Sequence, residues 1–183
     1  MYKIEKNKNR LLDDYEGVAF VIAAMGKEED RKNIYNRVLF DGACLWGCDG
    51  HRVHYYYVHN NAFDPGVYQL VSKDKNTIVL KKVVVRKKGG GAFPEISRLE
   101  IFSKTPKWSI EIKTDYTTGD REMIKSVEYA KIVKRLFRGI TINYKFFSDL
   151  PLGSYTVYSY GPESLVGFCN QNKGAGIMPL RIT

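Results

Sequence analysis

Two Asp-Gly pairs stand between short apolar runs, and they constrain the fold of this chain more than any other feature. The pairs are Asp41-Gly42 and Asp49-Gly50, and the runs they separate are 37–40, 44–46 and 52–58. Asp-Gly between apolar runs is the strongest short signal for a β-hairpin, because glycine readily adopts the positive φ of a tight turn. We therefore expect a three-stranded antiparallel meander over residues 37–58.

Two segments have the apolar periodicity of an amphipathic helix. The first covers about residues 11–26, where the apolar stripe consists of Leu11, Tyr15, Val18, Ile22 and Met25. The face opposite that stripe carries Asp13, Glu16 and Phe20. The second helix is predicted over residues 126–138, with Ser126 as its N-cap and Gly139 as its stop.

Further strand signals surround these helices. They lie at residues 66–71, 77–80, 108–112, 155–158, 165–169 and 175–178. Turns are predicted at 73–76 and 117–120, and a mobile loop is predicted at 86–91. Its three glycines are not followed by a helix, so they do not form a phosphate-binding loop, and a solvated linker is the simpler alternative. The predicted order of elements is therefore strand, helix, several strands, a second helix and three terminal strands.

Composition and charge predict the cellular environment of the protein and the kind of partner it binds. No run of about 18 apolar residues and no hydrophobic signal region exists, so we expect a soluble, cytoplasmic protein. Three cysteines are too few for a disulfide framework. Lys and Arg total 29 against 20 Asp and Glu, a net charge of +9, which favours a polyanionic partner.

Two short motifs together point to a family. The chain ends in Gly-Ala-Gly-Ile-Met-Pro-Leu-Arg-Ile-Thr at 174–183, and Cys-Asp-Gly-His-Arg-Val occupies 48–53. Phe93-Pro94-Glu95-Ile96 lies between them in the same order as a third family segment. This combination resembles the bacterial beta sliding clamp family, the processivity factors of DNA polymerases, in a short and divergent version.

The resemblance implies an α+β protein with the sliding-clamp, or processivity, fold, in which a domain consists of two halves, each a helix plus an antiparallel sheet. The predicted order of strands and helices matches this expectation. In that family the helices line the hole of a ring and the sheets form its outer wall. The order of elements predicts one clamp-like domain with insertions over residues 1–183, with any internal division near residues 93–107.

The resemblance also implies a cleft that receives a short peptide from a DNA polymerase, a clamp loader or a repair protein. Its residues here are Cys48, Gly50, His51, Arg52, Val53, Ile177, Met178, Pro179, Leu180 and Arg181. Met and Leu provide an adaptable apolar wall, Pro179 is expected to keep the tail out of a sheet ladder, and Arg52 and Arg181 are expected to anchor the peptide. The simpler alternatives are a plain hairpin turn and an edge strand.

A basic face on the second helix is the candidate contact to duplex DNA. It consists of Lys131, Lys134, Arg135 and Arg138. Such cations bind phosphates without sequence preference, as the ring-lining helices of the resembled family do. An ordinary solvated helix face is the alternative. One domain cannot encircle a duplex, so a ring requires a homo-oligomer; no contact with a membrane is expected.

Other chemistries have weaker support in the sequence. Cys44, Cys48, His51, His54 and His59 lack the pair spacing of a zinc site, and no arrangement of residues predicts catalysis, a metal or a cofactor. The protein is therefore expected not to be an enzyme. Thirteen tyrosines, among them Tyr55-Tyr56-Tyr57, support an alternative function, a sheet-based module that binds single-stranded nucleic acid.

Overall fold

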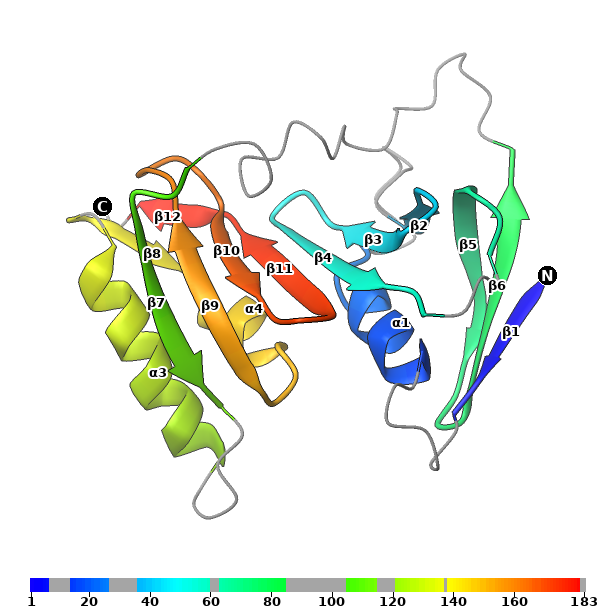
Figure 1. Cartoon of the computed structure of the whole chain (residues 1–183), viewed down its shortest axis with the longest axis horizontal. Helices are drawn as coiled ribbons and strands as arrows, with labels where there is room; N and C mark the ends of the chain where they lie inside the picture. Colours follow the sequence, from blue (N-terminus) through cyan, green and yellow to red (C-terminus); the bar gives the residue numbers. More distant parts are fainter. Residues whose placement is uncertain are drawn as a thin grey trace. The chain divides into compact units, whose positions relative to one another are not determined.

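The chain divides into two units, Met1–Pro94 and Glu95–Thr183, called unit 1 and unit 2 below. The structure is a computed structural model and is shown in Figure 1. It describes residues 1–6, 14–26, 36–59, 63–84, 105–114, 121–136 and 138–181. Each unit is described by itself.

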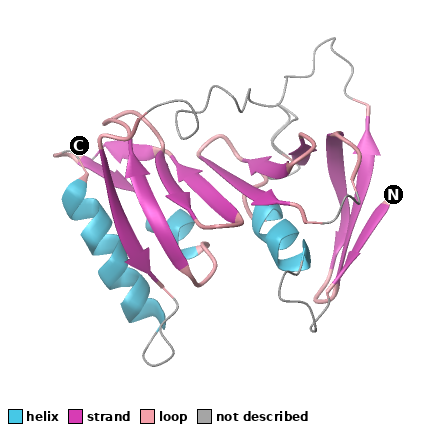
Figure 2. Ribbon diagram, viewed as in Figure 1, coloured by secondary structure: helices cyan, strands magenta, loops and turns pink. Residues whose placement is uncertain are grey.

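Unit 1 is one helix against an antiparallel sheet (Figure 2). Its elements are β1 (Tyr2–Glu5), α1 (Asp14–Ile22), β2 (Arg37–Phe40), β3 (Cys44–Cys48), β4 (Arg52–Tyr57), β5 (Gly66–Lys73) and β6 (Thr77–Val83). The strands of unit 1 follow the spatial order β1-β6-β5-β2-β3-β4, and every neighbouring pair is antiparallel. The meander predicted from the two Asp-Gly pairs is confirmed as β2-β3-β4.

Helix α1 is buried around most of its circumference. Tyr15, Val18 and Ile22 of the predicted stripe lie in the core of unit 1, where they pack with Leu45, Ile78 and other strand residues. Phe20, which the sequence places on the opposite face, is also buried, because its ring stacks on the imidazole of His54. The predicted exposed face is therefore narrower than the sequence indicates.

Unit 2 contains the second helix and the C-terminal strands. Its elements are β7 (Trp108–Lys113), α3 (Arg121–Arg135), β8 (Ile140–Ile142), α4 (Tyr144–Ser148), β9 (Ser154–Ser159), β10 (Val166–Cys169), β11 (Lys173–Ile177) and β12 (Pro179–Arg181). In this unit the sheet has the order β7-β9-β10-β11, antiparallel throughout, and β8 pairs with β12 in a separate two-stranded sheet. Helix α3 contacts α4, β7 and β8.

Several boundaries differ from the sequence-based expectation. Helix α3 begins at Arg121, so Ser126 lies inside the helix and is not its N-cap. The helix ends at Arg135, and Gly139, at φ +76°, stands in the turn before β8 rather than directly at the helix end. The predicted features at 86–91, 93–96 and 117–120 lie outside the described residues.

Two short elements of unit 2 were not expected. Strand β8 is too short to show a period, and α4 is a single turn whose N-cap Asn143 accepts a hydrogen bond from the Lys145 backbone N–H at 3.0 Å. The tail also differs from expectation, because β12 begins at Pro179 and pairs with β8. Proline is compatible with the first residue of a strand, so the expectation that Pro179 keeps the tail out of a ladder is wrong.

Both units repeat one plan, in which a strand and a helix precede an antiparallel meander (Figure 1). The predicted α+β class, with two helix-plus-antiparallel-sheet halves, is thereby confirmed. Among the described residues, no helix has the length and apolar character needed to cross a membrane.

Candidate functional site

The turn between β3 and β4 is held by the side chain of Asp49. Its Oδ1 accepts hydrogen bonds from the backbone N–H groups of His51 at 2.9 Å and Arg52 at 3.0 Å. Gly50 has φ +88°, in the left-handed region that favours glycine. The aspartates at the turns 41–44 and 74–77 make the same pair of bonds. Among the described residues of unit 1, this kind of turn therefore occurs three times.

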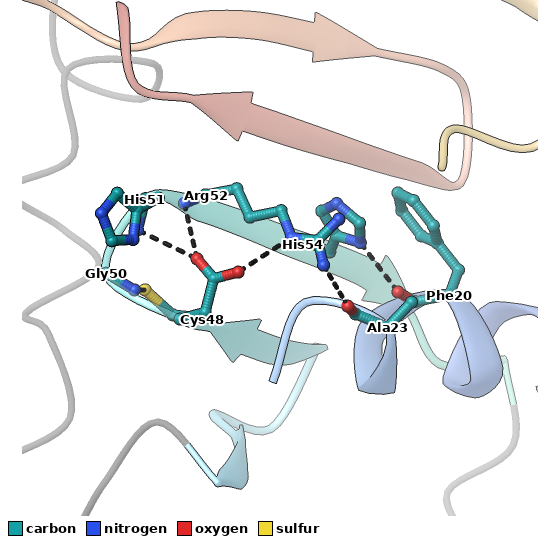
Figure 3. Close-up of polar contacts among 8 residues, drawn as sticks. Phe20, Ala23, Cys48, Gly50, His51, Arg52 and His54 are labelled. Atoms are coloured by element: carbon teal, nitrogen blue, oxygen red, sulfur yellow. Dashed lines mark hydrogen bonds and ion pairs between the residues drawn. The ribbon is translucent and has the colours of Figure 1, made fainter. Parts of the chain in front are cut away.

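Arg52 ties this turn to the end of α1 (Figure 3). Its Nε donates to Asp49 Oδ2 at 3.0 Å, and its terminal nitrogen donates to the carbonyl oxygen of Ala23 at 2.5 Å. The residue is only 8% exposed. A guanidinium at a helix C-terminus satisfies a carbonyl that has no partner within the helix and complements the helix dipole. Arg52 therefore has a structural task in unit 1.

Two further side chains of β4 continue this attachment along α1. His54 is fully buried, and its Nδ1 lies 2.8 Å from the carbonyl oxygen of Phe20 (Figure 3). Tyr56 donates its hydroxyl hydrogen to Asp14 Oδ1 at 2.9 Å, at the other end of the helix. Alternate residues of a strand point to the same face, so one strand holds α1 from its first residue to its last turn.

The surface of the turn is consequently small. Cys48 and Val53 are buried, and the Sγ of Cys48 accepts a hydrogen bond from the Gly50 N–H at 3.3 Å. Burial raises the pKa of the Cys48 thiol. Of the five turn residues assigned to the predicted cleft, only Gly50 and His51 are exposed.

The tail segment presents more apolar surface. Ile177 is fully buried, whereas Met178 and Leu180 are 41% and 43% exposed. Pro179 is half-buried, and Arg181 is exposed and forms an ion pair with Glu163. The turn and the tail belong to different units, and their common cleft stays a prediction.

The basic face of α3 lies on the surface of unit 2. Lys131, Lys134 and Arg135 are exposed on the helix, and Arg138 is exposed but follows the last helical residue. The helical period places Ala130, Ile132 and Leu136 opposite this basic face. Ile132 and Leu136 are buried accordingly, whereas Ala130 is exposed. Lys131 differs from the other cations because its Nζ lies 2.6 Å from Glu128 Oε1.

The alternative sites receive little support. The described residues contain no group of three or more His, Cys, Asp or Glu side chains that could hold a metal ion. Tyr55 and Tyr56 are buried, and Tyr57 is 45% exposed, so one ring of the triplet faces outward. A stacking platform for bases needs several exposed rings, and this strand offers one.

Comparison with known proteins identifies the fold. No protein-family model and no curated protein matches the chain. Among solved structures it is similar to DNA polymerase III subunit beta of Borrelia burgdorferi, at 12% identity and a TM-score of 0.60, over 100% of this chain and 65% of that one. The DNA polymerase III beta subunit of Thermotoga maritima has 13% identity and a TM-score of 0.56, over 100% and 66%. The DNA polymerase III subunit beta of Pseudomonas aeruginosa has 12% identity and a TM-score of 0.55, over 98% of this chain and 65% of that one.

These matches confirm the resemblance at the level of the fold. The chain has the fold of the bacterial DNA polymerase III beta sliding clamps, in a short and divergent version. It spans about two-thirds of the length of the clamp structures that it matches.

Proposed function

We propose that the protein is a non-enzymatic, sliding-clamp-like accessory factor of DNA replication or repair. It contacts duplex DNA through α3 and binds a short apolar peptide of partner proteins, such as a DNA polymerase, a clamp loader or a repair protein. The observation that carries this proposal is the fold, because the similar structures are DNA polymerase III beta subunits. Its two helix-plus-sheet units also repeat the order of elements expected for clamp halves.

The charge distribution supports DNA as the partner of α3. The chain carries a net charge of +9, and the last turn of α3 contains Lys134 and Arg135, both exposed. Helix α1 contains Asp14 and Glu16 and no Lys or Arg. Cations on a helix face bind the phosphate backbone without reading sequence. The duplex contact is therefore assigned to unit 2.

The exposed tail supports peptide binding. Met178 and Leu180 are two residues apart and are both more than two-fifths exposed. Flexible Met and Leu side chains suit a surface that accepts apolar peptides of varied shape. Arg181, beside them, is a cation at the rim that favours an acidic or carbonyl-rich peptide end. We assign the central apolar contacts of the peptide to Met178 and Leu180.

Assembly into a ring requires more than one chain. Among the described strands, β1 in unit 1 and β7 in unit 2 each pair with a single neighbour. An edge strand with unpaired backbone groups is a template for pairing with another chain. We propose that copies of the chain associate through sheet edges into a closed symmetric oligomer.

The peptide assignment is tested by titrating a fluorescent peptide rich in Gln, Leu and Phe. Met178→Ala and Leu180→Ala are each expected to weaken binding by about 1 to 3 kcal/mol, because they truncate central apolar contacts. His51→Ala, at a rim position, is expected to cost less.

Val127→Ala is the matched control, because Val127 is a similarly exposed apolar residue on α3, at 52%. Thermal melting first establishes that each variant is folded. Equal affinities for wild type and all variants, or no binding at high micromolar peptide, reject the peptide assignment.

A further inference from the structure

One carboxylate interrupts the row of side chains that α3 directs toward the interior of unit 2. Residues four apart lie on one ridge of a helix, and 124, 128, 132 and 136 form such a ridge. Ile132 is fully buried and Leu136 is 9% exposed, whereas Ile124 is half-buried. Glu128 stands between these isoleucines and is only 2% exposed. An apolar residue is the ordinary occupant of such a position, so the charge of Glu128 needs a partner.

Lys131 is that partner. Its Nζ lies 2.6 Å from Glu128 Oε1, and the Lys131 side chain is 54% exposed while that of Glu128 is 3% exposed. The second oxygen, Oε2, is buried and has no hydrogen-bond partner within the described part of the chain. A carboxylate buried without a counter-ion is strongly destabilising, so the ammonium group is held where Glu128 needs it.

This pairing divides the basic face into two kinds of cation. Lys134 lies one turn further along the same helix and makes no ion pair among the described residues. Lys134 therefore approaches a phosphate without abandoning a partner, whereas Lys131 has to leave Glu128 buried and unpaired.

We infer that Glu128 is a positioning residue that sequesters Lys131, so that Lys134 and Arg135 contact DNA phosphates and Lys131 does not. The inference rests on the proposed duplex contact of α3. Glu128 thereby controls how many phosphates the basic face of α3 neutralises. Removing its buried carboxylate is expected to strengthen DNA binding.

The first test needs no DNA. Limited acetylation followed by mass spectrometry compares Lys131 with its matched control, Lys134. An ammonium group bonded to a buried carboxylate is a poor nucleophile, so Lys131 is expected to react several-fold more slowly in the wild type. In Glu128→Gln the two rates are expected to become similar. Equal rates in the wild type, or an unchanged difference in the variant, overturn the inference.

The second test measures the salt dependence of duplex binding. The logarithm of the binding constant K falls as log salt concentration rises, and each phosphate contact adds about 0.9 to the magnitude of this slope. Lys134→Gln is therefore expected to reduce the slope by ~0.9 and Lys131→Gln to leave it unchanged. Glu128→Gln is expected to increase it by ~0.9, and the double variant Glu128→Gln/Lys131→Gln to return it to the wild-type value.

The double variant also serves as the folding control, because it leaves no buried charge without a partner. A loss of slope in Lys131→Gln equal to that in Lys134→Gln overturns the inference while keeping the proposed function. Absence of duplex binding by the wild type rejects the proposed function, and the acetylation rates then decide separately whether Glu128 holds Lys131.

Discussion

The two units use the same order of elements but attach their helices to the sheet in different ways. In unit 1, α1 lies so close to the sheet that a Cβ on Gly47 would stand 2.3 Å from the carbonyl oxygen of Val21. Arg52, His54 and Tyr56 fix the helix at further points. In unit 2, α3 packs through larger side chains such as Ile132 and Leu136 and keeps an exposed basic side.

This difference separates structural from binding tasks. A helix that is buried around most of its surface has little left to offer a ligand, and α1 exposes an acidic residue, Glu16, which is itself paired with Lys6. A helix that packs on one stripe leaves the other side for a partner, as α3 does with Lys134 and Arg135. We therefore propose a structural task for α1 and, in line with the proposed function, the duplex contact for α3.

The largest expected effect is on the packing of α1. Gly47→Ala places a methyl group against the helix backbone, which cannot move aside without shifting α1, so we expect a loss of about 3 kcal/mol in the free energy of unfolding of unit 1. Denaturant titration followed by the fluorescence of Trp46, with Trp108 replaced by Phe, measures this loss.

Gly161→Ala in unit 2 is the control, since a Cβ there would meet its nearest atom at an ordinary 3.5 Å. Gly161→Ala is expected to lose much less stability than Gly47→Ala, because its added methyl group displaces no neighbouring atom. A Gly47→Ala protein as stable as the control contradicts the close packing of α1.

The second prediction separates two neighbours in the turn. Arg52→Met removes the side-chain bonds to Asp49 Oδ2 and to the carbonyl oxygen of Ala23 while keeping an apolar stem and the backbone bond to Asp49. It is expected to destabilise unit 1 by about 2 kcal/mol. His51→Ala, at an exposed position, is expected to change stability by less than about 0.5 kcal/mol. Thermal melting of both variants is the measurement, and equal losses in the two would contradict the structural role of Arg52.

The third prediction concerns alkaline pH. Burial raises the pKa of the Cys44 thiol from its ordinary 9.0 to about 12, and it also raises that of Cys48. The folded state thus favours the protonated thiols, so their contribution to stability is complete below about pH 9 and is lost as the pH rises toward 12.

Unit 1 is therefore expected to lose stability in this range more than unit 2, where the corresponding shift is that of Tyr155, whose pKa burial also raises. The fluorescence of Trp46 and of Trp108, each in a variant that lacks the other, follows the two units. Replacing Cys44 and Cys48 with Ala is expected to reduce the difference between the two units in their loss of stability at alkaline pH. The same dependence of stability on pH in both units would contradict this prediction.

Much of the fold follows from local sequence. The Asp-Gly turns predicted β2, β3 and β4, because their chemistry lies within a few residues. The boundaries of α3 were missed, because Ser126 has the chemistry of an N-cap wherever it stands and only the surrounding structure shows that the helix begins earlier.

Side-chain roles that depend on distant elements were harder to predict. Arg52 has the appearance of a surface anchor in the sequence, and its burial depends on Ala23, 29 residues away along the chain. Periodicity placed Phe20 outside, whereas His54 covers it. Glu128 and Lys131 are three residues apart, but the pairing becomes significant only because the carboxylate is buried.

The most direct test of the proposed DNA contact compares two charge-matched variants. Sedimentation measures their binding to duplex DNA over a range of salt concentrations. Lys134→Glu/Arg135→Glu on α3 is compared with Lys73→Glu/Lys75→Glu, which makes the same change in net charge at the β5–β6 hairpin of unit 1. We expect the wild type and the unit 1 variant to form complexes with duplex DNA that contain more than one protein chain. For the α3 variant we expect at least about tenfold weaker binding and a slope reduced by ~1.8. Equal affinity and slope in the two variants would contradict the assignment of DNA contact to unit 2.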